Sequence, residues 1–194
     1  MYFKIKVRTF AKKMTFDKIT DDGRLWAVRY GDESDNELYK LFEQWNDVVW
    51  LRAFFKQNWS DLLAYYNILD VKTAIIDTIE DSDRLENILL SISLVADLDS
   101  VFKPLSNYTK ESFLGKEKAR LSQRQKHASW LRIYAIKLSQ GIFIITGGAI
   151  KLTATMQERD HTAKELVKIE QTRRFLIENG IVDETGFVDY LKEL

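Results

Sequence analysis

The sequence of 194 residues contains no cysteine, a single proline and two histidines. Without cysteine the chain has no disulfide, no thiolate zinc site and no cysteine nucleophile. With only His127 and His161, a histidine-rich metal site is not expected. No apolar run approaches the length of a membrane span, and the N-terminus lacks the apolar core of a signal peptide. We therefore expect a cytoplasmic protein that uses no metal, no other cofactor and no membrane.

What the sequence does contain is typical of a folded protein. Hydrophobic residues make up 45% of the chain and aromatic residues 12%, which is enough for a substantial core. One proline and eight glycines are too few for a low-complexity chain. The length predicts one domain, or one domain with a large extension.

The net charge of zero conceals an uneven distribution. Residues 1–100 hold 13 basic and 18 acidic side chains, whereas residues 101–194 hold 16 and 11. Most of the basic excess lies in residues 103–137, which contain nine Lys or Arg residues and only two glutamates. This asymmetry favours an anionic partner for the second half. A solvated loop with scattered lysines is the equally good structural alternative.

The first half predicts a hairpin followed by helices. Residues 2–10 and 25–30 have strand-like patterns, and Asp21-Asp22-Gly23 is a turn signal between them. Apolar residues at helical spacing follow from Ser34 onward, with Ser34 or Asp35 as the expected first cap. Asp47 and Asp70 are expected to cap two further helices, with a short one over residues 60–66 between them.

The second half predicts strands and a closing helix. Residues 107–129 form a long basic segment, with one helical option at residues 112–123. Residues 130–138 and 141–146 predict a hairpin, and Gly147-Gly148 indicates a bulge or a close backbone approach. A helix is expected over residues 159–179, ended by Asn179-Gly180, with a short terminal helix after it.

These patterns together predict an α+β protein. An N-terminal β-hairpin and helical region, residues 1–95, precedes a small twisted antiparallel sheet with packed helices in residues 96–194. The two regions are expected either as separate units or as one compact unit.

Strand residues in the second half carry a candidate RNA-cleaving site. Attack by a 2′-hydroxyl needs a base, a cation for the developing phosphate charge and an acid for the leaving oxygen. Arginine binds phosphate bidentately, and a tyrosine or lysine can move a proton when neighbouring cations lower its pKa. Arg132, Tyr134 and Lys151 meet these requirements and are the catalytic candidates. The candidate RNA-binding residues are Lys116, Lys118, Arg120, Arg124 and Lys126.

Each residue also has a plain structural interpretation. Tyr134 is equally well read as a core tyrosine, Arg132 as an ion-pair partner and Lys151 as an exposed strand lysine. Trp130 is better read as a core residue than as a base-stacking platform, and His161 as a hydrogen-bonding residue at a helix start. The co-occurrence of the basic and tyrosine residues on one sheet carries the functional hypothesis.

The segment from Val101 to Ile177 resembles the RelE/HigB-like toxins of bacterial toxin–antitoxin systems, in particular the phage-derived branch. The approach to the sheet (Leu98–Leu105) and the closing helix (His161–Arg174) resemble the corresponding family segments. The strand with Arg132-Ile133-Tyr134 and the stretch ITGGAIKLTATM (Ile145–Met156) carry the most distinctive similarity.

The resemblance implies a RelE-like sheet and an endoribonuclease that cleaves messenger RNA, usually on the ribosome, and is restrained by a cognate antitoxin. It assigns Arg132, Tyr134 and Lys151 to phosphate binding and catalysis, with Lys118 and Arg120 as supporting cations. The acidic first half has no counterpart; it could occlude the site, act as a built-in antitoxin-like element or form a homodimer interface. The alternative function is a non-catalytic protein that retains the fold and binds RNA or a protein partner.

Overall fold

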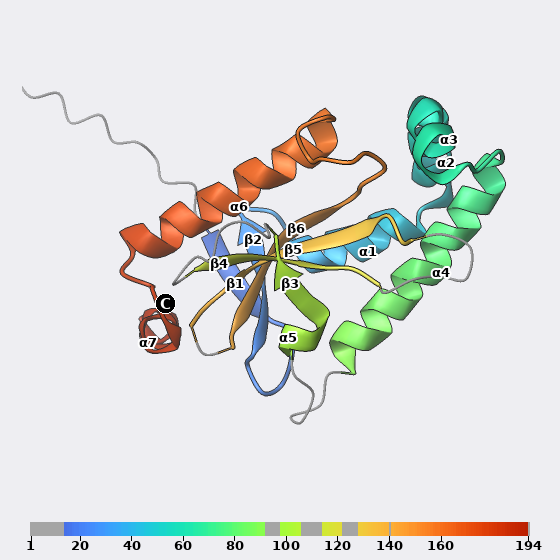
Figure 1. Ribbon diagram of the computed structural model, residues 1–194. Helices are drawn as coiled ribbons and strands as arrows, with labels where there is room; N and C mark the ends of the chain where they lie inside the picture. Colours follow the sequence, from blue (N-terminus) through green and yellow to red (C-terminus); the bar gives the residue numbers. More distant parts are fainter. Residues whose placement is uncertain (1–13, 92–97, 106–113, 122–127, 140, 194) are drawn as a thin grey trace, which may run out of the picture.

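The computed structural model describes residues 14–91, 98–105, 114–121, 128–139 and 141–193. The strand predicted over residues 2–10 lies outside the described residues, as do residues 106–113 and 122–127 of the basic segment. The described chain has the predicted α+β architecture: one six-stranded sheet with helices packed on both faces (Figure 1). None of its described helices combines the length and apolar character needed to cross a membrane.

The strands follow one another across the sheet in the order β1-β2-β6-β5-β4-β3. Their bounds are β1 Met14–Lys18, β2 Leu25–Tyr30, β3 Phe102–Pro104, β4 Gly115–Ala119, β5 Leu131–Lys137 and β6 Phe143–Ile150. Four neighbouring pairs are antiparallel, but β2 runs parallel to β6. The whole sheet is therefore mixed. The strands of residues 96–194 (β3, β4, β5 and β6) pair antiparallel, as predicted, and the parallel pair joins them to β2 of the first region. No hairpin turn fixes the direction of β2 against β6, because the helical region and three strands separate them in sequence.

An N-terminal hairpin forms, with β1 paired to β2 through the turn at residues 19–24. Its second strand is the predicted one, but its first strand is Met14–Lys18 and not the segment 2–10 expected from the sequence. Because β2 also pairs with β6, strands from residues 1–95 and from residues 96–194 belong to the same sheet.

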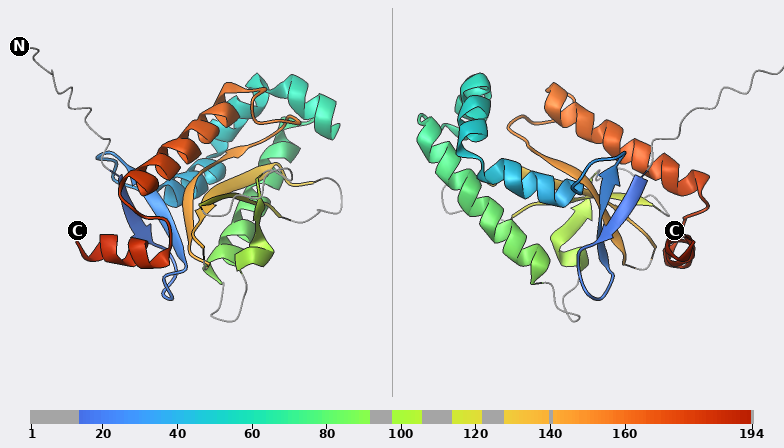
Figure 2. Two further views of the ribbon diagram at one scale, coloured as in Figure 1. Left: turned by 60° about the vertical axis from the view of Figure 1, so that its left-hand side comes forward. Right: turned by 180° about the vertical axis from the view of Figure 1, so that it is seen from behind.

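Alternation along β5 divides the core into two parts. Leu131, Ile133 and Ala135 face one side of the sheet, where they pack with helices α1, α2 and α4. Tyr134 and Ile136 face the other side, where helices α6 and α7 pack. The two sets of helices lie on opposite sides of the sheet in Figure 2. The helices are α1 Glu37–Asn46, α2 Val48–Gln57, α3 Trp59–Tyr66, α4 Val71–Leu90, α5 Leu98–Val101, α6 Asp160–Glu178 and α7 Glu184–Lys192.

Side-chain caps fix where the helices begin. The carboxylates of Asp47 and Asp70 accept backbone N–H bonds at the starts of α2 and α4, as predicted. The first helix is capped by Asn36, whose side chain accepts from the Tyr39 N–H, so the expected caps Ser34 and Asp35 are wrong. Asn36 takes this role because its backbone is extended immediately before the helical turn, and Asn caps as well as Asp or Ser.

Residues 115–119 form strand β4, in the segment 112–123 where the sequence allowed a helix. Its sequence, GKEKA, has almost no apolar signal, yet it pairs along its whole length with β5. Alternation buries Glu117 and Ala119 on one face and places Lys116 and Lys118 on the other. Pairing with the buried strand β5 therefore overrides the weak local preference of this segment. As a result, Lys118 lies directly opposite Tyr134.

Candidate anion-binding site

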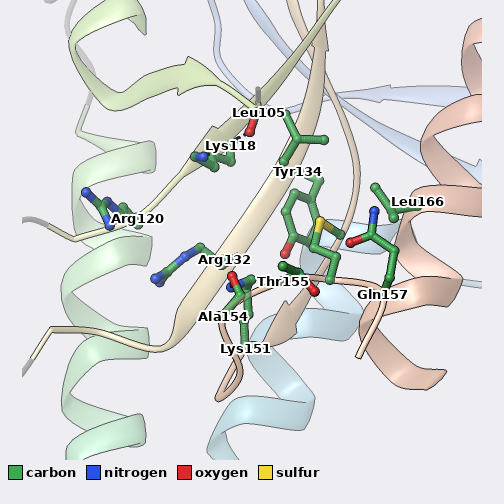
Figure 3. Close-up of a pocket in the computed structure, with 11 residues that line it drawn as sticks. Leu105, Lys118, Arg120, Arg132, Tyr134, Lys151, Ala154, Thr155, Gln157 and Leu166 are labelled. Carbon is green, nitrogen blue, oxygen red and sulfur yellow. Dashed lines mark hydrogen bonds between the residues drawn. The ribbon is translucent and has the colours of Figure 1, made fainter. Parts of the chain in front are cut away.

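Four basic side chains and one tyrosine line a single pocket of about 460 Å³. The pocket lies over β4 and β5 and is walled by the segment that follows β6 (Figure 3). In Figure 3, Tyr134 lies between the basic residues and Leu166 of α6. The structure thus brings together Lys118, Arg120, Arg132, Tyr134 and Lys151, which the sequence places on separate segments.

Arg132 is the most buried of the four basic residues, with 9% of its surface exposed. Its Nη1 donates hydrogen bonds to the carbonyl oxygens of Ser129 at 2.6 Å and Leu131 at 2.7 Å. Burial, together with the nearby charge of Arg120, lowers the pKa of Arg132. Its guanidinium remains charged, because an arginine pKa starts far above neutrality. One edge of Arg132 is therefore fixed by the backbone while the side chain lines the pocket.

The two lysines are held in a similar way. The Lys151 Nζ donates to the carbonyls of Thr153 and Ala154, both at 2.6 Å, and the Lys118 Nζ donates to the Leu105 carbonyl at 3.0 Å. Burial is the main cause that lowers the pKa of each lysine, and Arg132 adds to it in both cases. Burial, with a smaller contribution from the neighbouring positive charge, therefore makes each lysine easier to deprotonate.

Among the described residues, no carboxylate forms an ion pair with Lys118, Arg120, Arg132 or Lys151. Such a concentration of unneutralised positive charge at a concave site is suited to a phosphate group.

Among the described residues, the predicted RNA-binding residue Lys116 does not join this pocket. Lys116 shares the strand face of Lys118 but forms an ion pair with Glu170 of α6 at 2.5 Å, and it does not line the pocket. A carboxylate on α6 therefore neutralises its charge, and its role in RNA binding stays a prediction. Arg124 and Lys126 lie outside the described residues.

Tyr134 differs from the expected acid–base group. It is 1% exposed, and its hydroxyl has no hydrogen-bond partner among the described residues. Burial raises the pKa of Tyr134, and the opposing effect of Arg132 is smaller. The expectation that neighbouring cations lower this pKa is wrong, because desolvation of a phenolate outweighs them. A tyrosine that stays protonated can donate a proton or a hydrogen bond, but it cannot act as a base.

Two structural interpretations from the sequence are confirmed. Trp130 is fully buried, and its indole N–H donates to Thr78 Oγ1 of α4 at 2.9 Å. His161 is the second residue of α6, and its Nε2 lies 2.9 Å from the carbonyl oxygen of Ile150. His161 lines a different pocket and is therefore not part of the candidate site.

Sequence reasoning missed a buried charge cluster beside β6. The Lys168 Nζ bridges the carboxylates of Glu37 at 2.8 Å and Glu165 at 2.9 Å. Both glutamates are less than one-tenth exposed. Burial raises the pKa of Glu165; Lys168 opposes the shift and Glu37 adds to it. The cluster borders a second pocket of about 420 Å³ between α1, α2 and α6.

This cluster explains Gly147, whereas Gly148 is required by the close approach of the Arg132 carbonyl and of Leu41. Strand β2 pairs with β6 only as far as Ile145, so in the described structure the next residues of β6 face side chains instead of a strand. A Cβ at Gly147 would lie 2.0 Å from Glu165 Oε2, and the residue has a φ of +152°. The register shift opposite Tyr134 and Ala135 confirms the bulge predicted from the sequence. The signal that could have found the cluster is Gly147, which marks where the buried Glu165 carboxylate needs room.

No protein-family model matches this chain, and neither a curated protein nor a solved structure matches it. The functional proposal therefore rests on the chemistry of the pocket and on the resemblance drawn from the sequence.

Proposed function

We propose that the protein is a toxin-type endoribonuclease that binds RNA through the pocket of Lys118, Arg120, Arg132 and Lys151 and cleaves it without a metal. The observation that carries this proposal is the convergence of four basic side chains, none ion-paired to a carboxylate within the described structure, around one tyrosine. Messenger RNA, on or off the ribosome, is the proposed substrate, and a protein antitoxin is the proposed inhibitor.

Lys151 is the proposed general base. A neutral lysine amine has two N–H groups and one lone pair. The two carbonyls of Thr153 and Ala154 can accept both N–H groups, which leaves the lone pair available for the proton of a 2′-hydroxyl. The lowered pKa of Lys151 increases the fraction of this neutral form.

Arg132 and Tyr134 complete the proposed reaction. The 2′-oxygen attacks phosphorus while Arg132 stabilises the added charge on the phosphate oxygens. The bond from phosphorus to the 5′-oxygen breaks, and protonated Tyr134 gives that oxygen its proton. The products are a 2′,3′-cyclic phosphate and a free 5′-hydroxyl, and proton transfer through water restores both side chains.

A second candidate function is RNA binding without cleavage. The near-complete burial of Tyr134 favours it, since a phenol that substrate cannot reach leaves the pocket without its acid. Binding requires only the basic residues, all four of which line the pocket.

Cleavage of a fluorescein-labelled single-stranded RNA in EDTA tests the proposal and separates the two candidates. We expect the wild type to release fragments with cyclic phosphate ends, and Lys151→Gln to lose at least about 100-fold in rate. Lys192→Gln is the matched control, because Lys192 is an exposed lysine on α7. Binding without fragments would favour the second candidate. Neither binding nor cleavage would overturn both.

A further inference from the structure

Helix α3, from the acidic first half of the chain, is connected to the wall of the candidate site at three places. The wall is the segment Lys151–Arg159, which contributes Lys151 and residues 154–157 to the pocket. The three connections are Tyr66 to Lys151, Tyr65 to Glu158 and Asp61 to Arg159. They hold both ends of the segment, so the helix and the wall are expected to move together.

Tyr66 fixes the end of the wall that carries Lys151. Its hydroxyl donates to the Lys151 carbonyl at 3.1 Å, and its ring packs edge-on against Trp130 with the centroids 5.1 Å apart. The Lys151 N–H in turn donates to the Trp130 carbonyl at 2.8 Å. Tyr66 therefore packs where β5 begins and β6 ends, against Trp130, two residues before Arg132, and against Lys151.

Asp61 fixes the other end. Arg159 donates through Nε at 2.7 Å and through Nη2 at 2.5 Å to the two carboxylate oxygens of Asp61. Asp61 is 5% exposed, so this bidentate pair is partly shielded from water. The pair determines where the segment turns into α6.

The wall matters because Lys151 takes its position from it. The ammonium of Lys151 donates to the carbonyls of Thr153 and Ala154, which belong to the same segment. A displaced wall would move these acceptors, and the ammonium would move away from Arg132 or become more solvated.

We propose that Tyr66 and Asp61 are positioning residues that hold Lys151 in the pocket through the segment Lys151–Arg159. The acidic first half then supports the site instead of occluding it. The effect on RNA rests on the proposed function, whereas the effect on the side chain of Lys151 does not.

Two readouts test this inference in the full chain, with Tyr66→Phe and Asp61→Asn as the variants. The first is the pH titration of the Lys151 Cε resonance in protein labelled with ¹³C-lysine, assigned with Lys151→Arg. The second is the dissociation constant for a fluorescein-labelled single-stranded RNA. Tyr39→Phe and Asp189→Asn are the matched controls, because both residues are exposed and distant in the fold. Circular dichroism melts check that each variant is folded.

We expect each variant to shift the Lys151 titration towards the ordinary lysine pKa and to weaken RNA binding about fivefold, the usual effect of one lost hydrogen bond. In a Lys151→Gln background the same variants should leave RNA affinity unchanged, because they act through Lys151. An unchanged Lys151 titration in both folded variants would overturn the inference, as would an equal loss of affinity in the Lys151→Gln background. If the wild type binds no RNA, the proposed function fails, and the Lys151 titration alone decides the positioning role.

Discussion

Replacing Gly147 with alanine tests how closely the buried charge cluster approaches β6. The new Cβ would lie 2.0 Å from Glu165 Oε2 and 3.2 Å from its Cδ, so the carboxylate must move. The φ of +152° adds a backbone cost of about 2 kcal/mol for any L-residue. Displacing Glu165 from Lys168 adds about 3 kcal/mol, because a buried pair is disrupted. We therefore expect Gly147→Ala to lower the free energy of unfolding by about 5 kcal/mol.

Urea denaturation of four proteins measures this effect: wild type, Gly147→Ala, Glu165→Ala and the double variant. With Glu165 truncated, Gly147→Ala should cost only the backbone contribution of about 2 kcal/mol. The cycle therefore predicts a coupling of about 3 kcal/mol between the two positions. Gly31→Ala is the control, because Gly31 has a φ of +63° and no atom within 4 Å of an added Cβ. An equal cost of Gly147→Ala in both backgrounds would refute the proposed contact.

Three further predictions concern charge. Lys168→Met should lower the free energy of unfolding by about 3 kcal/mol in urea denaturation, because it leaves the buried carboxylate of Glu165 without its cation and Glu37 with Lys40 alone. Burial raises the pKa of Glu165, so its contribution to stability is present at low pH and is lost as the pH rises above about 4.3, the unfolded value. Glu165→Gln should therefore gain stability relative to the wild type between pH 4 and pH 8, and a constant difference would contradict this. Arg132→Ala should melt at a lower temperature than Lys151→Gln, because it leaves two backbone carbonyls without their donor in a buried site.

Much of the fold follows from patterns that the sequence carries locally. Helices α2 and α4 with their caps Asp47 and Asp70, and the hairpin of β5 and β6, depend on neighbouring residues, and the structure confirms them. Strand β4 and the parallel pairing of β2 with β6 could not be predicted in this way. Both depend on partners that lie far away in sequence, and β4 has little apolar character of its own.

In the candidate site, too, features set by the local sequence could be predicted, and features set by residues distant in sequence could not. The alternation of β5 correctly places Arg132 and Tyr134 on one face, and both line the same pocket as Lys151. The extent to which Tyr134 is buried could not be predicted, because it depends on residues of α6 and of the segment after β6 that pack over the strand. The ion pair of Lys116 with Glu170 could not be predicted either, because it joins β4 to α6, which lie far apart in sequence.

The central claim is that the pocket binds RNA phosphate through its basic residues. Fluorescence anisotropy of a labelled single-stranded RNA, recorded in EDTA over a series of salt concentrations, tests it most directly. The logarithm of the affinity should fall linearly with the logarithm of the salt concentration, and Lys151→Gln should reduce that slope by about 0.7, as expected for one lost phosphate contact. Lys192→Gln should leave the slope unchanged. Equal slopes and equal affinities for the wild type and Lys151→Gln would contradict the account.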